Sequence, residues 1–396
     1  MSAPVSVRKV ESKRDFETFL KFPWALYKGD PYWVPPLVSQ MRHKLDRKLN
    51  PSWAYMEGDY FLAWRGEQPV GTIAAFINHR HNEFHNEHIG FFGLFQVYDD
   101  QEAATALLET AADYVRGLGY DAIRGPASFS TNDECALLIE GFDGPPLLLM
   151  PYNYPYFQRL VENTPGFEKV MDLYSYYITL EGVQSDDGQY LEKLFRVTRK
   201  NNARRRITVR PPDLKHLKQE FLTLKAIYNR AWDKNWGFVP FSDDELDEMV
   251  KELGQFFEPR LTFFAEVEGR PVGFLLGIPD MNQVLHKAYP RPGKPELLAM
   301  LQALWHWKVR SKITRFRVML LGVQENHRGL GVESAMFAEL YQSAVQMDWH
   351  YADGGWVLET NAPMQRLVEA YRAEPYRRYR FYERALKPPS SEVGPG

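Results

Sequence analysis

One stretch of the chain decides the fold, and it reads VMLLGVQENHRGLGVE from Val318 to Glu333. The run from Val318 to Val323 is apolar and β-branched at both ends, which predicts a buried strand. A tight basic glycine turn follows, and after it the sequence predicts a helix that runs to about Met347. We therefore expect a strand, a turn and a helix in direct succession.

The turn carries the residue types that bind an anion. Gly329 and Gly331 lack a Cβ atom, so backbone N–H groups can approach a ligand closely. The helix behind them offers N–H donors and the positive end of its dipole, and Arg328 adds a guanidinium suited to phosphate oxygens. Together they predict a pyrophosphate site. The alternative is an ordinary turn between a strand and a helix.

Two common nucleotide-binding motifs do not fit this spacing. A P-loop needs a Lys directly after its second glycine, and here Val332 follows Gly331. The dinucleotide fingerprint needs three glycines, whereas this turn has two. The sequence therefore excludes both motifs at this turn.

The composition predicts a globular chain with full hydrophobic cores. Its 396 residues correspond to about two or three domains, and 44% of them are hydrophobic. The net charge of −3 argues against a general nucleic-acid binder. A single cysteine, Cys135, excludes an internal disulfide framework and indicates a reducing compartment. We see no signal peptide at the start and no run of about 18 apolar residues, so we expect a cytoplasmic protein without a transmembrane segment.

Two patterns occur twice along the chain. The segment AWRGEQPVG at 63–71 is echoed by AEVEGRPVG at 265–273, and QRLVE at 158–162 recurs at 365–369. The spacing from the proline to the glutamine is 89 positions in the first copy and 94 in the second. Each copy predicts a hairpin, strand, helix, strand, helix and strand. This order predicts the α/β class, as an α+β sandwich in which helices flank one mixed, mostly antiparallel sheet.

The turn of the second copy resembles the acyl-CoA loop of the GNAT superfamily of N-acetyltransferases, Arg/Gln-x-x-Gly-x-Gly/Ala. Arg328, Gly331 and Glu333 stand at its three specified positions, and Glu333 departs from the small residue of the family. The order of elements also matches the GNAT fold. The resemblance therefore implies tandem GNAT-like domains at 1–183 and 189–388, with a linker at Gln184–Gly188 and a disordered tail at 389–396.

The resemblance implies acetyl-CoA or a longer acyl-CoA as co-substrate, bound by the second copy and without a metal. The main chain of the strand would bind the pantetheine arm, the turn would hold the pyrophosphate, and an Asn would begin the last helix. The implied residues are Leu321, Gly322, Val323, Arg328, Gly329, Leu330, Gly331, Val332 and Asn361.

The first copy lacks this turn. After Val97 the sequence continues Tyr98-Asp99-Asp100-Gln101-Glu102, with neither glycine nor arginine and with three acidic residues that would repel a pyrophosphate. We therefore expect the first copy to have no acyl-CoA site, and to support the fold or shape the substrate cleft instead.

In GNAT-type chemistry an amine attacks the thioester directly, so a base must accept a proton from the ammonium. Glu359, at the end of the strand before Asn361, is the first candidate for that base, and Glu325 and Asp353 are weaker ones. The alternative for each is a solvated surface carboxylate.

A general acid could protonate the departing thiolate. The tyrosine that does so in the family follows its Asn by about seven residues. Val368 stands at that position here, and the nearest tyrosine is Tyr371. Tyr371 is therefore the candidate acid, with a packing tyrosine as the alternative.

Three polar segments have more than one interpretation. The four histidines of His79–His88 could hold a metal, but the absence of cysteine and the intervening Asn and Glu residues favour a solvated, mobile connection. Arg204–Arg206 predict either a solvated face or a site for phosphate or a carrier. Arg377–Tyr382 could line an acceptor cleft, or could form an amphipathic edge strand.

The predicted function is acyl-CoA-dependent N-acyl transfer to an amine, either a small molecule or a lipid. The chain resembles a bacterial group of GNAT proteins of about this length, some of which are thought to acylate long-chain sphingoid amines. The alternative from another class is a non-catalytic protein that binds acyl-CoA or senses another ligand. Nucleic acid is not an expected partner, and assembly into a homodimer is left open.

Overall fold

The computed structural model describes residues 3–130, 133–179, 188–232, 235–240, 242–254, 257–310 and 313–386. They form two compact units. Unit 1 comprises the described parts of Met1–Asp172, Tyr289–Ala299 and Tyr379–Gly396, and unit 2 those of Leu173–Ala288 and Met300–Arg378. Most of the expected linker Gln184–Gly188 and the whole tail 389–396 lie outside the described residues. The domain limits expected from the sequence therefore stay a prediction.

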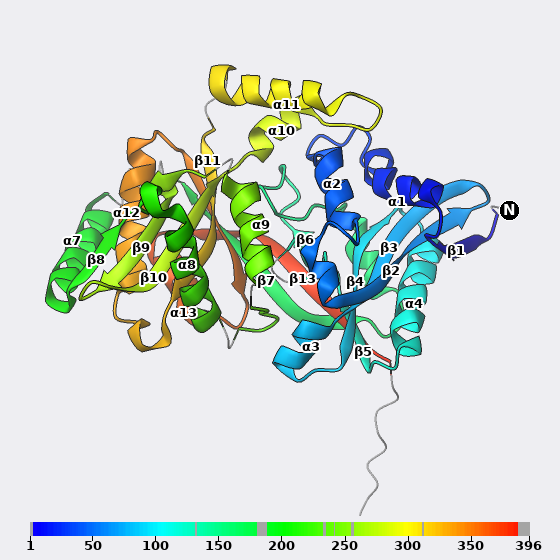
Figure 1. The fold of residues 1–396 in the computed structure, drawn as a ribbon, viewed down its shortest axis with the longest axis horizontal. Helices are drawn as coiled ribbons and strands as arrows, with labels where there is room; N and C mark the ends of the chain where they lie inside the picture. Colours follow the sequence, from blue (N-terminus) through cyan, green and yellow to red (C-terminus); the bar gives the residue numbers. More distant parts are fainter. Residues whose placement is uncertain are drawn as a thin grey trace, which may run out of the picture. The chain divides into compact units, whose positions relative to one another are not determined.

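Helices and strands are interspersed along the described chain (Figure 1). The first half contains β1 (Val5–Lys9), α1 (Lys13–Leu26), α2 (Val38–Leu45), β2 (Met56–Arg65), β3 (Gln68–Asn78), α3 (His79–His85), β4 (Ile89–Val97), α4 (Gln101–Gly117), β5 (Ala122–Gly125), β6 (Leu137–Glu140), α5 (Tyr156–Glu162) and β7 (Glu168–Thr179). The second half contains α7 (Gly188–Arg205), β8 (Ile207–Arg210), α8 (Leu217–Ala231), α9 (Asp243–Gly254), β9 (Thr262–Val267), β10 (Arg270–Pro279), α10 (Asn282–Ala288), α11 (Glu296–Trp305), β11 (Arg315–Val323), α12 (Val332–Gln346), β12 (Tyr351–Leu358), α13 (Ala362–Ala370) and β13 (Glu374–Ala385). Short 3₁₀ turns span Pro51–Ala54, Leu214–His216, Pro259–Leu261 and Glu325–His327, and a π-helical turn spans His306–Arg310.

Unit 1 contains a sheet in the order β1-β2-β3-β4-β5-β13. The pair β4–β5 is parallel, and the other pairs are antiparallel. The last strand enters this sheet from the end of the chain, since Tyr382 to Ala385 pair with Gly125 to Ala122. The strand order places β13 between β5 and β7, so the amphipathic edge strand considered for Arg377–Tyr382 is wrong.

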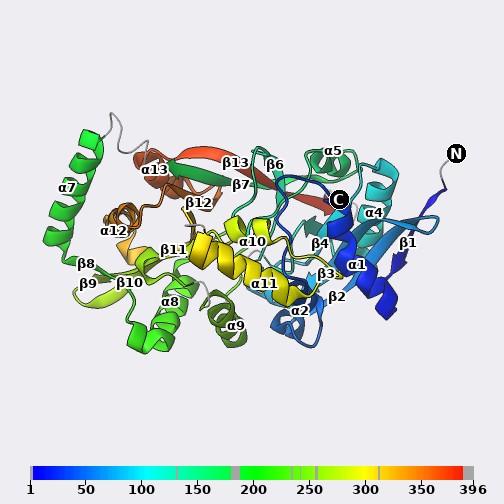
Figure 2. The same ribbon diagram turned by 90° about the horizontal axis from the view of Figure 1, so that it is seen from above.

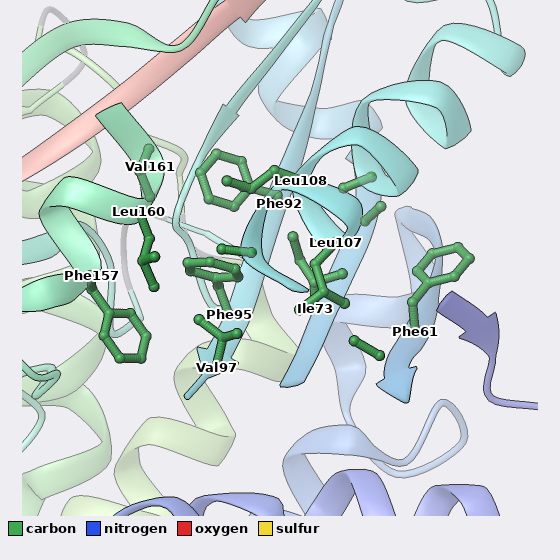
Figure 3. Close-up of a cluster of buried hydrophobic side chains, with 14 of the residues drawn as sticks. Phe61, Ile73, Phe92, Phe95, Val97, Leu107, Leu108, Phe157, Leu160 and Val161 are labelled. Atoms are coloured by element: carbon green, nitrogen blue, oxygen red, sulfur yellow. The ribbon is translucent and has the colours of Figure 1, made fainter. Parts of the chain in front are cut away.

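The core of unit 1 forms where α4 covers the sheet (Figure 3). Buried residues recur along α4 at the spacing of one helix face, as in Ala104, Leu108 and Ala111. They meet aromatic side chains of β4, among them Phe92 and Phe95, at the centre of the cluster. Burying each large apolar side chain contributes about 1.5–3 kcal/mol, which makes this face the main stabilising contact of unit 1.

Unit 2 repeats the same architecture. Its sheet has the order β7-β12-β11-β10-β9-β8, in which β11–β12 is the parallel pair and the other pairs are antiparallel. Buried residues of α8 and β10, including Leu224 and Phe274, form a second core. The predicted fold class, in which helices flank a mixed and mostly antiparallel sheet, is confirmed.

The repeated hairpins share one irregularity. In β3, Val70 is an extra residue between the pairs Trp64–Pro69 and Ala63–Gly71. In β10, Val272 is the extra residue in the matching place, directly after Pro271. A proline has no N–H to donate to the ladder, so a bulge beside it is expected. The shared bulge supports the internal repeat seen in the sequence.

The histidine segment is ordered rather than a mobile connection. Residues 79–85 form α3, which is capped by the side chain of Asn78 and ends at Asn86 in the left-handed conformation. His81 is buried and its Nε2 lies 2.8 Å from Glu87 Oε2. The sequence-based interpretation missed this helix because four histidines carry no apolar periodicity. No helix in the described parts of the chain is long and apolar enough to cross a membrane.

Candidate active site

The parallel strands of unit 2 separate part-way along their length. The β11–β12 ladder runs from Arg315–Tyr351 to Arg317–Asp353, although both strands continue. Each strand then contains a bulge: Met319 is the extra residue in β11, and Gly355 and Trp356 together oppose one residue of β7. Bulges redirect strands and often lie next to active sites. The opening between β11 and β12 is therefore the place where a linear ligand could pair with β11.

The edge of β11 at this opening carries two bonds from side chains. The indole Nε1 of Trp232 donates to the Leu321 carbonyl over 3.0 Å, and Arg328 Nε donates to the Val323 carbonyl over 3.1 Å. These are the carbonyls that the resemblance assigns to the pantetheine arm. Gly322, between them, is required by packing, since a Cβ there would lie 2.6 Å from the Phe274 ring. A ligand on this edge would have to exchange with Trp232.

The basic turn is held by its own arginine. Besides Val323, Arg328 binds the carbonyl of Ala231 at the end of α8. Gly329 has φ +68° and Gly331 has φ +95°, a backbone region in which side chains are strained. Two left-handed glycines allow the turn to present N–H groups, as the sequence predicts, and α12 begins directly after Gly331.

Helix α7 supports the turn from outside. Asn201 Nδ2 donates to the Leu330 carbonyl over 2.8 Å, and Arg205 Nε donates to Asn201 Oδ1 over 3.1 Å. A Cβ on Gly331 would lie 2.4 Å from Asn201 Nδ2, so this contact also explains the glycine. Sequence reasoning missed Asn201, because a contact across 129 positions leaves no local signal.

Of the predicted arginine patch, Arg206 forms an exposed ion pair with Glu268 at 3.0 Å. Arg205 instead belongs to the chain of contacts that ends at the turn. The arginines of the patch therefore have different roles: Arg206 belongs to a solvated ion pair, and Arg205 supports the glycine turn through Asn201.

Glu333 reaches back over the turn. Its Oε1 lies 3.4 Å from the backbone nitrogen of Gly329, which is a long hydrogen bond. The carboxylate thus uses one of the donors that the turn would offer to a phosphate. Val332 beside it is fully buried and anchors the first turn of α12.

Tyr371 lies under α12. It is 3% exposed, its ring packs 5.2 Å from that of Phe337, and its hydroxyl donates to the Ser334 carbonyl over 2.9 Å. Burial raises the pKa of Tyr371 well above its usual range, and the nearby Tyr190 adds to the shift. In this state the hydroxyl proton is directed at the main chain of the first turn of α12.

The other two predicted residues lie together after β12. Glu359 is half-buried, and its backbone carbonyl accepts a hydrogen bond from Gln365 Nε2 at 3.1 Å. Asn361 caps α13, since its Oδ1 accepts the N–H of Met364 at 3.2 Å. Both residues follow the strand that borders the opening.

Asp353 marks the point where the two strands separate. It is fully buried, and the hydroxyl of Tyr376 donates to its Oδ2 over 2.6 Å. Burial raises the pKa of Asp353, while Arg317, Tyr376 and Arg377 act in the opposite direction. Arg317 also donates to the Gly355 carbonyl across the bulge. The sequence named Asp353 as a minor candidate but could not indicate this burial.

The corresponding edge in unit 1 lacks the glycine turn and also carries hydrogen bonds. The hydroxyl of Tyr156 donates to the Val97 carbonyl over 2.9 Å, and the N–H of Ala127 donates to the Phe92 carbonyl over 2.9 Å. Helix α4 starts directly after Asp100, which also pairs with Arg65 at 2.7 Å. These contacts favour the prediction that the first copy has no acyl-CoA site.

Comparison with known proteins gives the family. No family model matches the chain. Protein YghO of Escherichia coli is 30% identical over 384 residues, which is 96% of this chain and 95% of that protein. A bacterial ceramide synthase of Caulobacter vibrioides is 30% identical over 390 residues, which is 97% of this chain and 98% of that protein. The chain belongs to their family.

The fold of this family member is that of the GNAT superfamily. A tandem GNAT protein from the clavulanic acid biosynthesis pathway superposes with a TM-score of 0.54 at 12% identity, covering 97% of this chain and 99% of that one. The predicted recognition of tandem GNAT domains is confirmed, and acyl transfer is the general chemistry that it supports.

The residues present fit an acyl-CoA as co-substrate. Left-handed glycines, Arg328 and the first turn of α12 provide donors for a pyrophosphate. The part of β11 that does not pair with β12 has main-chain groups suited to an amide-containing arm, although Trp232 and Arg328 bond two of its carbonyls. For acyl-CoA to bind, Glu333 would have to release the Gly329 N–H and Trp232 would have to release the Leu321 carbonyl.

Proposed function

We propose that this GNAT protein transfers a long acyl group from acyl-CoA to the amino group of a lipid of the sphingoid class. The observation that carries the proposal is the parallel pair β11–β12, whose strands part next to the turn that ends at Gly331. The identity of 30% to a bacterial ceramide synthase along 97% of the chain supports the lipid acceptor. Acetyl transfer to a small amine is the alternative within the same reaction class.

The reaction is a direct displacement. The amine nitrogen attacks the thioester carbonyl carbon, a C–N bond forms, and the C–S bond breaks as CoA leaves as a thiolate. One proton leaves the attacking nitrogen and one reaches the departing sulfur. Holding both substrates together supplies much of the acceleration, so no covalent intermediate is needed. Cys135, which is buried in unit 1, is not required as a nucleophile.

The glycine turn would hold the pyrophosphate. Arg328 uses N–H groups on Nε and Nη2 for Val323 and Ala231, and a guanidinium carries five such groups. It can therefore keep the turn in place and still donate to a phosphate. The N-terminal turn of α12 adds its dipole.

Two carboxylates compete for the role of base. Glu359 is the proposed base, because it is partly accessible and follows the strand that borders the opening. Asp353 is the second candidate, because burial raises its pKa toward the range that a general base needs. If Glu359 is the base, Glu359→Gln should lower kcat roughly a hundredfold and remove the acid limb of the pH–rate profile. If Asp353→Asn shows this fall in kcat and loss of the acid limb while Glu359→Gln stays active, Asp353 is the base instead.

Tyr371 is the proposed acid, on condition that its hydroxyl leaves the Ser334 carbonyl when the substrates bind. Tyr371→Phe keeps the packing on Phe337 and removes only that hydroxyl. A fall in kcat of roughly tenfold or more, at unchanged KM for the donor, supports the role. An unchanged kcat assigns the proton to water instead.

The proposed activity is tested with the full chain, palmitoyl-CoA and sphinganine. We expect release of the CoA thiol together with an amide product detected by mass spectrometry, and much slower turnover with acetyl-CoA and a small polar amine. Gly331→Asp should abolish donor binding, because the new side chain would meet Asn201 and add a negative charge. Asp99→Ala, at the matching turn of the first copy, is the control and should bind normally. Equal loss in both variants would contradict the assignment of the site to the second copy.

A non-catalytic acyl-CoA-binding protein is the second candidate. The contacts of Glu333, Trp232 and Tyr371 favour it, since each uses a group that catalysis would need. Calorimetric binding of acyl-CoA without thioester consumption across a panel of long-chain and short amines would support it. The absence of any acyl-CoA binding would remove both candidates.

A further inference from the structure

Helix α11 exposes its large apolar side chains instead of burying them. From Leu297 to Trp305 it contains no charged residue. Six large apolar residues of the helix are each 49% to 64% exposed: Leu297, Leu298, Met300, Leu301, Leu304 and Trp305. None of the residues of α11 is buried. The helix is drawn in yellow after α10 in Figures 1 and 2.

The exposed side chains occupy one broad face. Leu297, Leu301 and Leu304 follow each other at the spacing of one helix stripe. After Glu296, the half-buried positions of the helix are the small ones, Ala299 and Ala303. A helix that packs on its own protein shows the opposite pattern, with leucines inside and small or polar residues outside. A contiguous exposed patch of this kind marks an interaction surface.

The charges around the helix indicate what covers it. Arg291 and Lys294 precede α11, and Lys308 and Arg310 follow it. The single acid in this segment, Glu296, accepts the backbone N–H of Ser39 at 2.9 Å. An apolar face with cations at both ends is complementary to a bilayer that carries anionic headgroups.

Aromatic residues and a basic depression agree with that partner. Trp305 ends the exposed face and Trp307 follows it, half-buried, in the π-helical turn; tryptophan favours the level of the headgroups. Arg42, His43, Arg291 and Lys294 are among the residues that line a depression of about 440 Å³ in unit 1, which also includes Glu296. Arg42 is ion-paired with Glu17, so Arg291 and Lys294 are the cations of this lining best suited to meet a lipid phosphate.

A second copy of the chain suits the face less well. Both ends of the segment are cationic, so pairing two α11 helices in either direction would bring like charges together. The length of α11 also limits the geometry. Its ten residues span about 15 Å, against about 30 Å for the hydrocarbon core of a bilayer.

We propose that α11 docks the protein onto anionic membranes, with the helix lying flat in the interface and the cations that directly precede and follow it meeting lipid phosphates. This goes beyond the proposed function, because it concerns a surface made of other residues than the glycine turn and requires no catalysis. A membrane-bound enzyme would meet a lipid acceptor in the layer where that acceptor is concentrated.

Sedimentation of the full chain with vesicles tests the proposal. We expect binding to phosphatidylcholine vesicles that contain phosphatidylglycerol, weaker binding to phosphatidylcholine alone, and a loss with added salt. The double variant Leu301→Glu/Leu304→Glu should bind roughly tenfold more weakly or worse. Leu222→Glu is the matched control, since Leu222 is an exposed leucine on α8, at 42%, and should leave binding unchanged.

A second variant separates the charges from the apolar face. Arg291→Gln/Lys294→Gln should remove the preference for phosphatidylglycerol while keeping the weaker binding. The proposal is overturned if the unaltered chain fails to sediment with either vesicle, or if the leucine variant binds as well as the control. It is also overturned if light scattering finds a dimer that Leu301→Glu/Leu304→Glu dissociates. Acyl-CoA binding, measured on the same variants, should not change, so failure here is distinguishable from failure of the proposed function.

Discussion

At the scale of single residues, Glu333 gives the turn an acceptor from within the chain. A phosphate oxygen would compete with its carboxylate for the Gly329 N–H and would be repelled by its charge. Glu333→Gln should therefore bind CoA several-fold more tightly, on the order of 1 kcal/mol. Calorimetry at low salt would show the difference, and Glu339→Gln, an exposed acid on the same helix, is the control. Unchanged affinity would mean that Glu333 swings clear of the site.

Asn201 is a positioning residue at the same scale, because it acts on the donor only through the Leu330 carbonyl. Asn201→Ala removes this hydrogen bond and should weaken CoA binding about fivefold. The donor KM should rise while kcat changes little, since the acyl group lies elsewhere. Glu192→Ala, on the exposed side of α7, is the matched control. A fall in kcat alone would contradict a role in positioning the turn.

At the scale of elements, α3 and β5 are joined by an ionic cluster. Glu87 binds both His81 and Arg124, and Arg124 also binds Glu383 of β13 at 2.7 Å. Burial raises the pKa of Glu87, but its bonds to His81 and Arg124 outweigh burial and lower it to about 2 from an ordinary value of 4.5. The folded state therefore holds the charged form more strongly than the unfolded chain does.

This cluster predicts acid sensitivity in unit 1. A lowered carboxyl pKa stabilises the fold above pH 4.5, and this stabilisation is lost as the pH falls toward 2. After allowance for solvent around a half-exposed group, we expect about 1 kcal/mol from Glu87. Urea titrations between these pH values should show a flatter profile for Glu87→Gln than for Glu83→Gln, an exposed control on α3. Parallel profiles would assign the acid sensitivity to other groups.

Elements with a local signature were predictable from the sequence, and those without one were not. The hairpins around Pro69 and Pro271 and the strand ending at Val323 are predictable, because their apolar patterns and flanking turn residues are typical of strands. The helix α3 is not, because its histidines carry neither periodicity nor a strong propensity. The position of β13 inside a sheet was also missed, since strand order depends on partners far away in the sequence.

The candidate site divides in the same way. The glycines and Arg328 stand in one short segment, so their spacing alone predicted a phosphate turn. Trp232 and Asn201 reach that segment from helices about a hundred positions away. The burial of Asp353 depends on strands from three parts of the chain, so the sequence could offer it only as one carboxylate among several.

At the scale of the whole molecule, unit 1 depends on the end of the chain. Tyr382 and Leu386, which are 1% and 7% exposed, belong to its core, and β13 pairs with β5. A fragment of residues 1–183 should therefore lack a cooperative thermal transition, although it contains most of the unit. Circular dichroism would test this, and a peptide covering 374–386 should restore the transition when added. A cooperative transition of the fragment alone would show that the last strand is dispensable.

The paired bulges at Val70 and Val272 also separate what the two copies share from what they do not. In both hairpins the extra valine follows a proline and precedes a glycine that pairs with an alanine of the preceding strand. The Val70 carbonyl accepts the N–H of Tyr98, and the Val272 carbonyl accepts the N–H of Gln324; each donor directly follows the next strand. Inheritance from one ancestral hairpin explains this agreement. The turns after Val97 and Val323 share none of this agreement. The hairpin geometry is therefore common to both copies, whereas the anion-binding type of turn occurs after Val323 and not after Val97.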